Sequence, residues 1–455
     1  MSKIEVNTVE PQCGTTLTLG ASGDTVTLGS GASQSGFGRT GTVDWQTSIK
    51  TTGFTAVSGE GYFCNTTGGA FTVTLPSSPS AGDIVALKDY ANTWDSNNLT
   101  VGRNSSNIGG EAQDSVLALE GLAVTLVYAD ATKGWLVTES GLQNEAPGPE
   151  FISATGGTIT TVCTNFKVHT FTSPGTFTVC SAGNSGGSNT VSYMVIAGGG
   201  GGGYYTPAGG AGGYRESKAI TDTYTASPLN ATSGAFYNLP VTAQGYPITV
   251  GGGGNGGGPP DSDGTKGSDS IFSTVTATGG GYGAGGPATS NSSRTGGPGG
   301  SGGVGAPKVP SGGWTPGSGN TPPVSPPQGN DGGTSHHEPG VYQLGGGGGG
   351  AGGVGGSVSP AGPGATSAAS GGAGTTSSIN GTPTVRASGG SGGSDNTPRP
   401  GGAATPGGGG AGGGPSQSGG AGTANTGGGG GGSGSGSVTS GNGGSGIVII
   451  RYKFQ

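Results

Sequence analysis

Two short motifs place residues that could bind a metal ion close together in the sequence. His336, His337 and Glu338 are adjacent, and imidazole and carboxylate groups are common metal ligands. Adjacent side chains point in different directions, so joint coordination would need a special loop or a symmetry axis, and a solvated loop is the better interpretation. Asp261 and Asp263 suggest part of a calcium loop, but the bidentate glutamate that closes such a loop is missing, which favours an ordinary turn. We therefore expect no metal and no cofactor.

The other reactive side chains are also sparse. Cys13, Cys64, Cys163 and Cys180 are scattered, and the last two flank a predicted hairpin, so a disulfide between them is geometrically possible. The polar N-terminus leads us to expect no signal peptide, and small buried thiols are the better interpretation. No nucleophile elbow, phosphate loop or paired metal motif occurs, so we expect that the chain is not an enzyme.

Composition sets the chain apart from an ordinary enzyme domain. Glycine accounts for 113 of 455 residues, whereas charged residues make up 9% and hydrophobic residues 29%. The net charge of −7 argues against nucleic acid as a partner, because phosphate binding needs clustered Lys and Arg. Residues 1–150 contain 21 of the glycines and residues 151–455 contain 92, so the two parts need separate explanations.

Residues 1–50 are interpreted as a short-strand β stalk or attachment segment. Thr16-Leu-Thr-Leu-Gly20 recurs as Thr25-Val-Thr-Leu-Gly29, and alternating Thr and aliphatic residues fit short strands with one apolar face. Such strands cannot bury their apolar faces alone, so pairing with copies of the same segment, and hence an oligomer, is expected. A loose tail is the alternative.

Residues 51–145 are predicted to form a β-sandwich or barrel module, because short alternating strands are separated by turn signals. The predicted strands are Gly61–Asn65, Ala70–Leu75, Asp83–Asp89, Leu99–Arg103, Val116–Leu119, Ala123–Ala129 and Gly134–Val137. Residues 146–197 are predicted to be a linker, up to residue 155, followed by strands. These strands are Thr158–Cys163, Lys167–Thr172, Gly175–Val179 and Val191–Ala197, with a hairpin around Pro174-Gly175.

Residues 198–455 are dominated by glycine runs. The runs are 198–203, 251–254, 256–258, 279–281, 345–350, 407–410, 412–414 and 427–432. Collagen is excluded because it needs glycine at every third position without breaks. A flexible linker remains open, but an ordered lattice of polyproline-II-like strands is favoured, because only glycine lets such strands bond to neighbours on all sides. The chain as a whole is therefore predicted to be all-β, with this lattice and its long loops at the C-terminal end.

Strand-like segments support the lattice. Four of them, Tyr193–Ala197, Tyr246–Val250, Ser273–Thr278 and Val341–Leu344, lead directly into glycine runs, which a linker would not need. The chain ends in Gly446–Phe454, a strong β-strand, and we expect it to return and pair with Tyr193–Ala197.

These patterns resemble the glycine-rich domain of bacteriophage tail fibre proteins and are similar to the polyglycine-sandwich adhesins at some fibre tips. The resemblance covers about residues 165–455 and rests on Phe171–Val179, Met194–Gly203, Tyr246–Gly251 and Gly443–Tyr452. The module around Gly61–Phe63, Val73–Pro76, Ala81–Ile84 and Leu99–Arg103 is similar to modules common in phage fibres. The adhesins proper usually lack a β stalk like residues 51–145, so fibre tip and fibre body are fused here or the role differs.

The resemblance implies a virion protein of the tail fibre, often a homotrimer, that assembles in the host cytoplasm. It further implies contacts to other tail proteins and to a host surface receptor, a glycan or an outer-membrane protein. Aromatic and His residues in the loops between runs are the candidate receptor-binding residues, because exposed aromatic side chains are typical binding anchors. They are Tyr204, Tyr205, Tyr282, Trp314, His336, His337 and Tyr342. The alternative is that these rings cover the edges of the lattice.

Two other functions are considered. The first is a structural fibre or decoration protein of the capsid or tail without a primary recognition role. The second is a depolymerase that cuts surface polysaccharide, a reaction that usually needs two placed carboxylates. It is disfavoured because Asp395 is the only acidic residue in 341–455.

Overall fold

The computed structural model describes residues 43–142, 149–184, 186–286, 294–306, 315–338, 341–358 and 366–455. The chain divides into two compact units, Met1–Pro147 and Gly148–Gln455. All regular elements in the described residues are β-strands, which confirms the predicted all-β class. Among these residues there is no helix long and apolar enough to cross a membrane.

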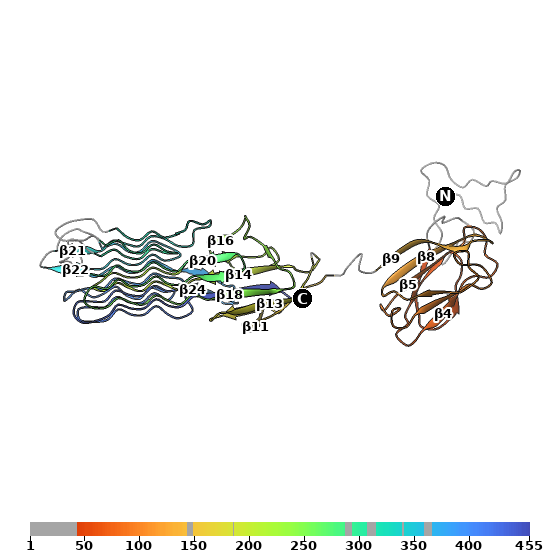
Figure 1. Cartoon of the computed structure of the whole chain (residues 1–455), viewed down its shortest axis with the longest axis horizontal. Coiled ribbons are helices and arrows are strands. Elements are labelled where there is room, and N and C mark those ends of the chain that lie inside the picture. Colours follow the sequence, from red (N-terminus) through yellow and green to blue (C-terminus); the bar gives the residue numbers. More distant parts are fainter. Residues whose placement is uncertain are drawn as a thin grey trace, which may run out of the picture. The chain divides into compact units, whose positions relative to one another are not determined.

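The first unit contains two sheets that share one core (Figure 1). The five-stranded sheet has the order β1 (Asp44–Lys50), β3 (Glu60–Cys64), β5 (Ile84–Asp89), β8 (Leu122–Asp130), β9 (Gly134–Leu142). The four-stranded sheet has the order β2 (Phe54–Thr55), β4 (Phe71–Thr74), β6 (Leu99–Gly102), β7 (Ser115–Leu117). Alternate residues such as Val73, Val85 and Leu87 are buried between them. All seven strands predicted between residues 51 and 145 are present.

Strand β1 falls within the segment predicted to be an attachment stalk. It pairs in parallel with β3, from Asp44 opposite Glu60 to Lys50 opposite Cys64. Residues 43–50 therefore extend the first sheet of the first unit. The paired repeats at 16–20 and 25–29 lie outside the described residues.

The second unit has a base of two sheets. The seven-stranded sheet runs β11 (Thr158–Val162), β12 (Phe166–Phe171), β25 (Ile447–Lys453), β14 (Thr190–Ile196), β15 (Tyr214–Ser217), β16 (Asn230–Ala231), and β17 (Leu239–Pro240) also pairs with β14. The five-stranded sheet runs β10 (Ile152–Thr155), β13 (Gly175–Ala182), β18 (Gly245–Thr249), β19 (Ser270–Phe272), β20 (Val275–Ala277). Buried Phe177, Tyr193 and Ile450 belong to a core cluster that joins them.

The predicted return of the C-terminus is confirmed. β25 lies between β12 and β14 and pairs antiparallel with both, placing Tyr193 opposite Ile450. The last strand of the chain therefore holds the centre of the base sheet.

The predicted hairpin around Pro174-Gly175 is wrong. β12 pairs with β11 and β25, whereas β13 pairs with β10 and β18, so the turn carries the chain from one sheet to the other. Pro-Gly specifies a turn locally, but the partner of each strand depends on which apolar face is buried, and Phe171 and Phe177 both enter the core between the sheets. The predicted linker is also too long, because it contains β10.

The glycine runs form an ordered lattice that extends from this base (Figure 1). In residues 198–203 the backbone hydrogen bonds repeat at every third residue. The N–H groups of 198, 201 and 204 donate to the backbone carbonyls of Ser268, Thr265 and Ser262, which belong to one neighbouring segment. Those of 199 and 202 donate to the carbonyls of Gly444 and Gly441 in a second segment. Those of 200 and 203 donate to the carbonyls of Gly210 and Pro207 in a third. Three residues per turn is the repeat of a polyproline-II helix, so each face of the run meets a different neighbour.

The carbonyl groups of the same run follow the same repeat. Those of 198 and 201 accept from Gly280 and Gly283, those of 199 and 202 from Gly254 and Gly257, and that of 200 from Gly430. The next bond in this series would join the Gly203 carbonyl to the N–H of Ser433. The Ser440 hydroxyl stands between these two groups: it accepts from the Ser433 N–H at 2.9 Å and donates to the Gly203 carbonyl at 2.7 Å. A side chain thus replaces one lattice bond without breaking the series.

Close approach of the backbones explains why the residues are glycine. A Cβ on Gly200 would lie 2.1 Å from the carbonyl oxygen of Gly281, and a Cβ on Gly201 would lie 1.9 Å from that of Asn255. In the run 251–254 a Cβ on Gly252 would meet no atom within 4 Å, and three residues later, on the same face of the strand, Asn255 carries an exposed side chain. Glycine is therefore required only on faces that meet another strand.

We expect Gly200→Ala to destabilise the second unit by roughly 3 kcal/mol or more, because the backbone of Gly281 must move. The matched variant Gly252→Ala should change stability by less than about 1 kcal/mol. Chemical denaturation of the full chain, with the two units followed separately, measures both. Equal effects of the two substitutions would contradict the lattice packing.

Candidate functional site

A hairpin lies at the end of the lattice opposite β11 and β13 (Figure 1). Its strands are β21 (His336–Glu338) and β22 (Tyr342–Leu344), which pair antiparallel with His337 opposite Gln343 and Glu338 opposite Tyr342. Because lattice faces that meet another strand have no room for side chains, polar and aromatic residues collect where the chain turns. We call the group around this hairpin the tip cluster: Tyr204, Tyr205, His336, His337, Glu338, Tyr342, Gln343, Asp395 and Arg399.

One side of the hairpin is charged. The His336 ring lies 5.8 Å from that of Tyr342, and His336 Nε2 lies 3.7 Å from a carboxylate oxygen of Glu338. The Arg399 guanidinium lies over the Tyr342 ring, 4.1 Å from its centroid. A positive group above an aromatic face is a cation–π contact, so Arg399 is held over the buried ring.

Asp395 ties a second loop to the hairpin. Its carboxylate accepts from the Gln343 N–H at 2.5 Å, and its own N–H donates to the Gln343 carbonyl at 3.2 Å. Its carbonyl accepts from the Ser435 hydroxyl at 3.3 Å. Burial raises the pKa of the Asp395 carboxyl.

The segment after the first glycine run joins the same cluster. The rings of Tyr204 and Tyr205 lie 5.7 Å apart, and the Tyr204 hydroxyl donates to the Gly436 carbonyl at 2.9 Å. The Gln343 amide donates to the carbonyl of Tyr205 at 3.2 Å, and burial raises the pKa of the Tyr205 hydroxyl. Segments more than 200 residues apart in sequence therefore meet at the tip.

The structure brings together five of the seven candidate residues, but it does not expose them all. Tyr204 and Tyr342 are buried, at 8% and 3% exposure, and therefore pack the tip instead of projecting from it. Tyr282 lies elsewhere: a Cβ on Gly297 would lie 2.3 Å from its ring, so it covers the lattice. Trp314 lies outside the described residues.

Gln343, Asp395 and Arg399 were missed by sequence reasoning. Asp395 had one signal, as the only acid in 341–455, whereas Gln343 and Arg399 had none. Within the described residues, His337 Nδ1 and Gln343 Oε1 are buried without a hydrogen-bond partner. They belong to directly opposite residues of the hairpin, so two polar atoms on one face lack donors or acceptors.

The Asp261-Asp263 turn holds a guanidinium. Arg294 bonds both carboxylates, at 3.1 Å and 3.3 Å, and also reaches the Asp261 carbonyl. A side-chain cation therefore occupies the space between the two acids. Across the described ranges, no three His, Cys, Asp or Glu residues lie close enough to hold a metal ion.

The cysteines are unpaired where the structure describes them. Cys64 is buried, and burial raises the pKa of its thiol to about 12. Cys163 and Cys180 are both free and exposed, so the expectation of buried thiols is wrong for these two, and the possible disulfide is not formed. The physical reason is that β12 and β13 lie in different sheets. Cys13 lies outside the described residues.

We expect the tip hairpin to lose stability as the pH falls below about 6.5, the ordinary pKa of His337. Burial lowers the pKa of His337, although Asp395 nearby opposes this shift. The folded tip therefore keeps the imidazole neutral where the unfolded chain, with a pKa near 6.5, already binds a proton. The stability contribution is present above pH 6.5 and is lost below it.

Amide exchange at Tyr342–Leu344, corrected for its intrinsic pH dependence, measures this change. Protection should fall roughly a few-fold in the wild type and less in His337→Gln. Protonation of Asp395 has the opposite effect on stability, at pH values nearer its ordinary pKa of 3.8. Because burial raises its pKa, the folded tip binds this proton more readily than the unfolded chain does and is stabilised as the pH falls. Equal loss of protection in both proteins would show that His337 is not the cause.

The chain has no significant match among curated proteins. A family model described as a glycine-rich domain matches residues 171–453, from the end of β12 to the end of β25. This range contains the lattice, the tip cluster and most of the base, and it is more than half of the chain. The protein therefore belongs to the glycine-rich domain family.

Proposed function

We propose that this protein is a bacteriophage tail fibre or adhesin subunit whose tip cluster recognises the host cell surface. The observation that carries the proposal is the separation of roles within the second unit. The lattice is built mainly from glycine, whereas the turns at its far end bring together charged and aromatic residues of distant segments. A rigid support that gathers turns with charged and aromatic side chains at one end suits a binding surface.

The tip offers groups for polar recognition. The Glu338 side chain is 49% exposed, and His336 and Arg399 are partly exposed beside it. Glu338 and Arg399 supply an acceptor and a donor of opposite charge, a combination that fits hydroxyl-rich or charged surface groups. Asp395 is engaged with the Gln343 backbone, which supports binding at the tip in preference to polysaccharide cleavage.

The remaining parts of the proposal rest on the resemblance to phage fibres. The protein would be a homotrimer that assembles in the host cytoplasm and resides in the virion. Its N-terminal segment would contact other tail proteins, and the receptor would be a glycan or an outer-membrane protein. These features are proposals about the assembled particle.

A structural fibre or decoration protein is the second candidate. The burial of Tyr204 and Tyr342 favours it, because two of the expected aromatic anchors stabilise the tip itself. The two candidates differ in whether the exposed charges of the tip affect adsorption.

We expect the purified protein to bind host cells and to compete with phage adsorption. The triple variant His336→Ala, Glu338→Ala, Arg399→Ala should reduce competition about tenfold or more, because exposed charged contacts are lost. The control Ile220→Ser, Val354→Ser changes side chains that are 75% and 66% exposed outside the tip cluster and should compete normally. Equal competition by both variants would refute tip recognition, and detection in virions without any binding to cells would favour the structural role.

A further inference from the structure

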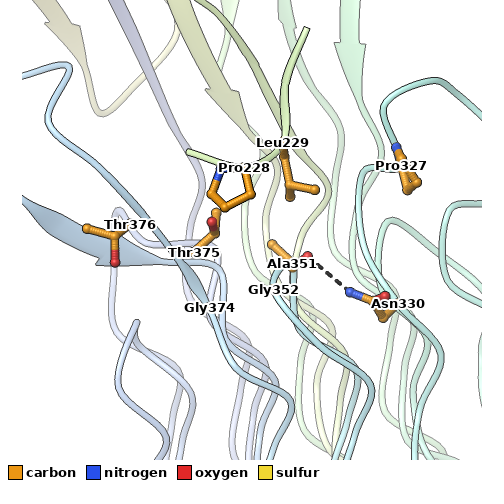
Figure 2. A pocket seen from close by; sticks show the side chains of 9 residues that line it. All are labelled: Pro228, Leu229, Pro327, Asn330, Ala351, Gly352, Gly374, Thr375 and Thr376. Carbon is orange, nitrogen blue, oxygen red and sulfur yellow. Dashed lines mark hydrogen bonds between the residues drawn. The ribbon is translucent and has the colours of Figure 1, made fainter. Parts of the chain in front are cut away.

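A pocket of about 450 Å³ lies beside a small sheet near the junction of the base and the lattice (Figure 1). The sheet consists of β23 (Thr375–Ser377) and β24 (Thr384–Arg386), which pair antiparallel. Residues 374–376 line the pocket together with Pro228, Leu229 and others, and no residue of the tip cluster lines it (Figure 2). A pocket of this size holds a small ligand or a short peptide segment.

The backbone of Thr376 faces away from β24. In an antiparallel pair, the N–H and C=O groups of successive residues point alternately toward the partner strand and away from it. The N–H of Ser378 donates outside the pair, to the Thr225 carbonyl at 3.0 Å, and the N–H of Ala387 on the other strand also donates outside the pair. Thr376 and its partner Val385 lie two residues before these positions, so their N–H and C=O groups point outward as well.

The outward groups of Thr376 have no hydrogen-bond partner among the residues that the structure describes. The segment that runs beside this edge uses its own backbone elsewhere. The Ser227 N–H donates to the Glu216 carboxylate at 3.0 Å, and the Ser227 carbonyl accepts from the Asn230 N–H at 3.1 Å. Pro228 has no N–H to donate. The outer edge of β23 therefore presents one free donor and one free acceptor beside the pocket.

The rest of the pocket wall is uncharged and held in place. Pro228, Leu229 and Ala351 form an apolar surface (Figure 2). The Asn330 amide donates to the carbonyls of Gly350 and Ala351, at 2.9 Å and 3.0 Å, so this side chain is fixed across the pocket from β23. None of the described lining residues carries a charge, so the pocket suits an apolar side chain.

We propose that the outer edge of β23 binds an extended peptide segment of a partner protein, which pairs with Thr376 and places an apolar side chain in the pocket. The N–H and C=O groups of one extended residue point to the same side, so that residue matches both free groups of Thr376. A trans amide on a sugar points its N–H and C=O in opposite directions and matches only one of them.

Strand addition at an exposed edge is a common mode of peptide recognition. The backbone bonds supply affinity, and pockets for alternate side chains supply specificity. Thr375 is buried and Thr376 is exposed, so the two faces of β23 differ. The side chain next to the pairing residue of the peptide lies on the face of Thr375 and reaches the apolar wall. This contact is independent of the recognition proposed for the tip cluster.

Calorimetric titration of the full chain with four probes tests the strand addition. The probes are acetyl-Leu-Ser-Leu-amide, the same peptide with an N-methyl group on its serine, acetyl-Ser-Ser-Ser-amide and N-acetylglucosamine. Saturable binding of the first is expected. The N-methyl peptide should bind about fivefold more weakly, because it cannot donate to the Thr376 carbonyl, and the all-serine peptide should also bind more weakly, because it leaves the apolar wall uncovered.

Thr376→Pro removes the outward N–H and should weaken binding of the first peptide about fivefold or more. The pairing of β23 with β24 is kept, because its hydrogen bonds come from Thr375 and Ser377, and proline is tolerated at an outward position of an edge strand. The control Thr376→Val keeps the N–H and should bind like the wild type. If Thr376→Pro fails to fold, Leu229→Ser tests the apolar wall and should weaken binding several-fold.

Four outcomes would overturn strand addition at this edge. They are the absence of saturable peptide binding, equal binding of the N-methyl peptide, equal binding by folded Thr376→Pro and Thr376→Val proteins, and binding of N-acetylglucosamine as tight as that of the first peptide.

Discussion

The second unit depends on one interaction, the backbone hydrogen bond between polyglycine strands. In a strand with three residues per turn, successive N–H and C=O groups point in three directions, and residues 198–203 bond a different neighbour in each direction. A β-sheet bonds each strand on two sides only, and its side chains must then be buried by another layer. The lattice needs no side-chain layer, because backbone groups satisfy one another on all sides.

Because of this constraint, the base, the lattice and the turns of the second unit have different roles. The lattice cannot begin by itself, because glycine loses more conformational freedom on folding than any other residue. The base provides the fixed starting points: β14 leads into 198–203, β18 into 251–258, and β25 returns to hold β14 in place. The turns at the far end are free of the packing constraint, so charged and aromatic residues such as Glu338, Arg399 and Tyr205 accumulate there.

The base of the second unit, in contrast to the lattice, contains a buried ion pair. In the base, Arg451 Nε donates to both carboxylate oxygens of Asp222 at 3.0 Å, and this ion pair ties β25 to the loop after β15.

The sequence by itself predicted seven of the nine strands of the first unit, favoured the ordered lattice over a flexible linker, and indicated the pairing of the C-terminal strand with Tyr193–Ala197. Alternation of side chains and the cost of ordering glycine are local properties, which a sequence displays directly. Only the tertiary structure decided that Pro174-Gly175 joins two sheets, that Tyr204 and Tyr342 are buried, and that Gln343, Asp395 and Arg399 meet at the tip. These outcomes depend on which distant segments become neighbours, and in a lattice built mainly from glycine the sequence holds little side-chain signal to identify them.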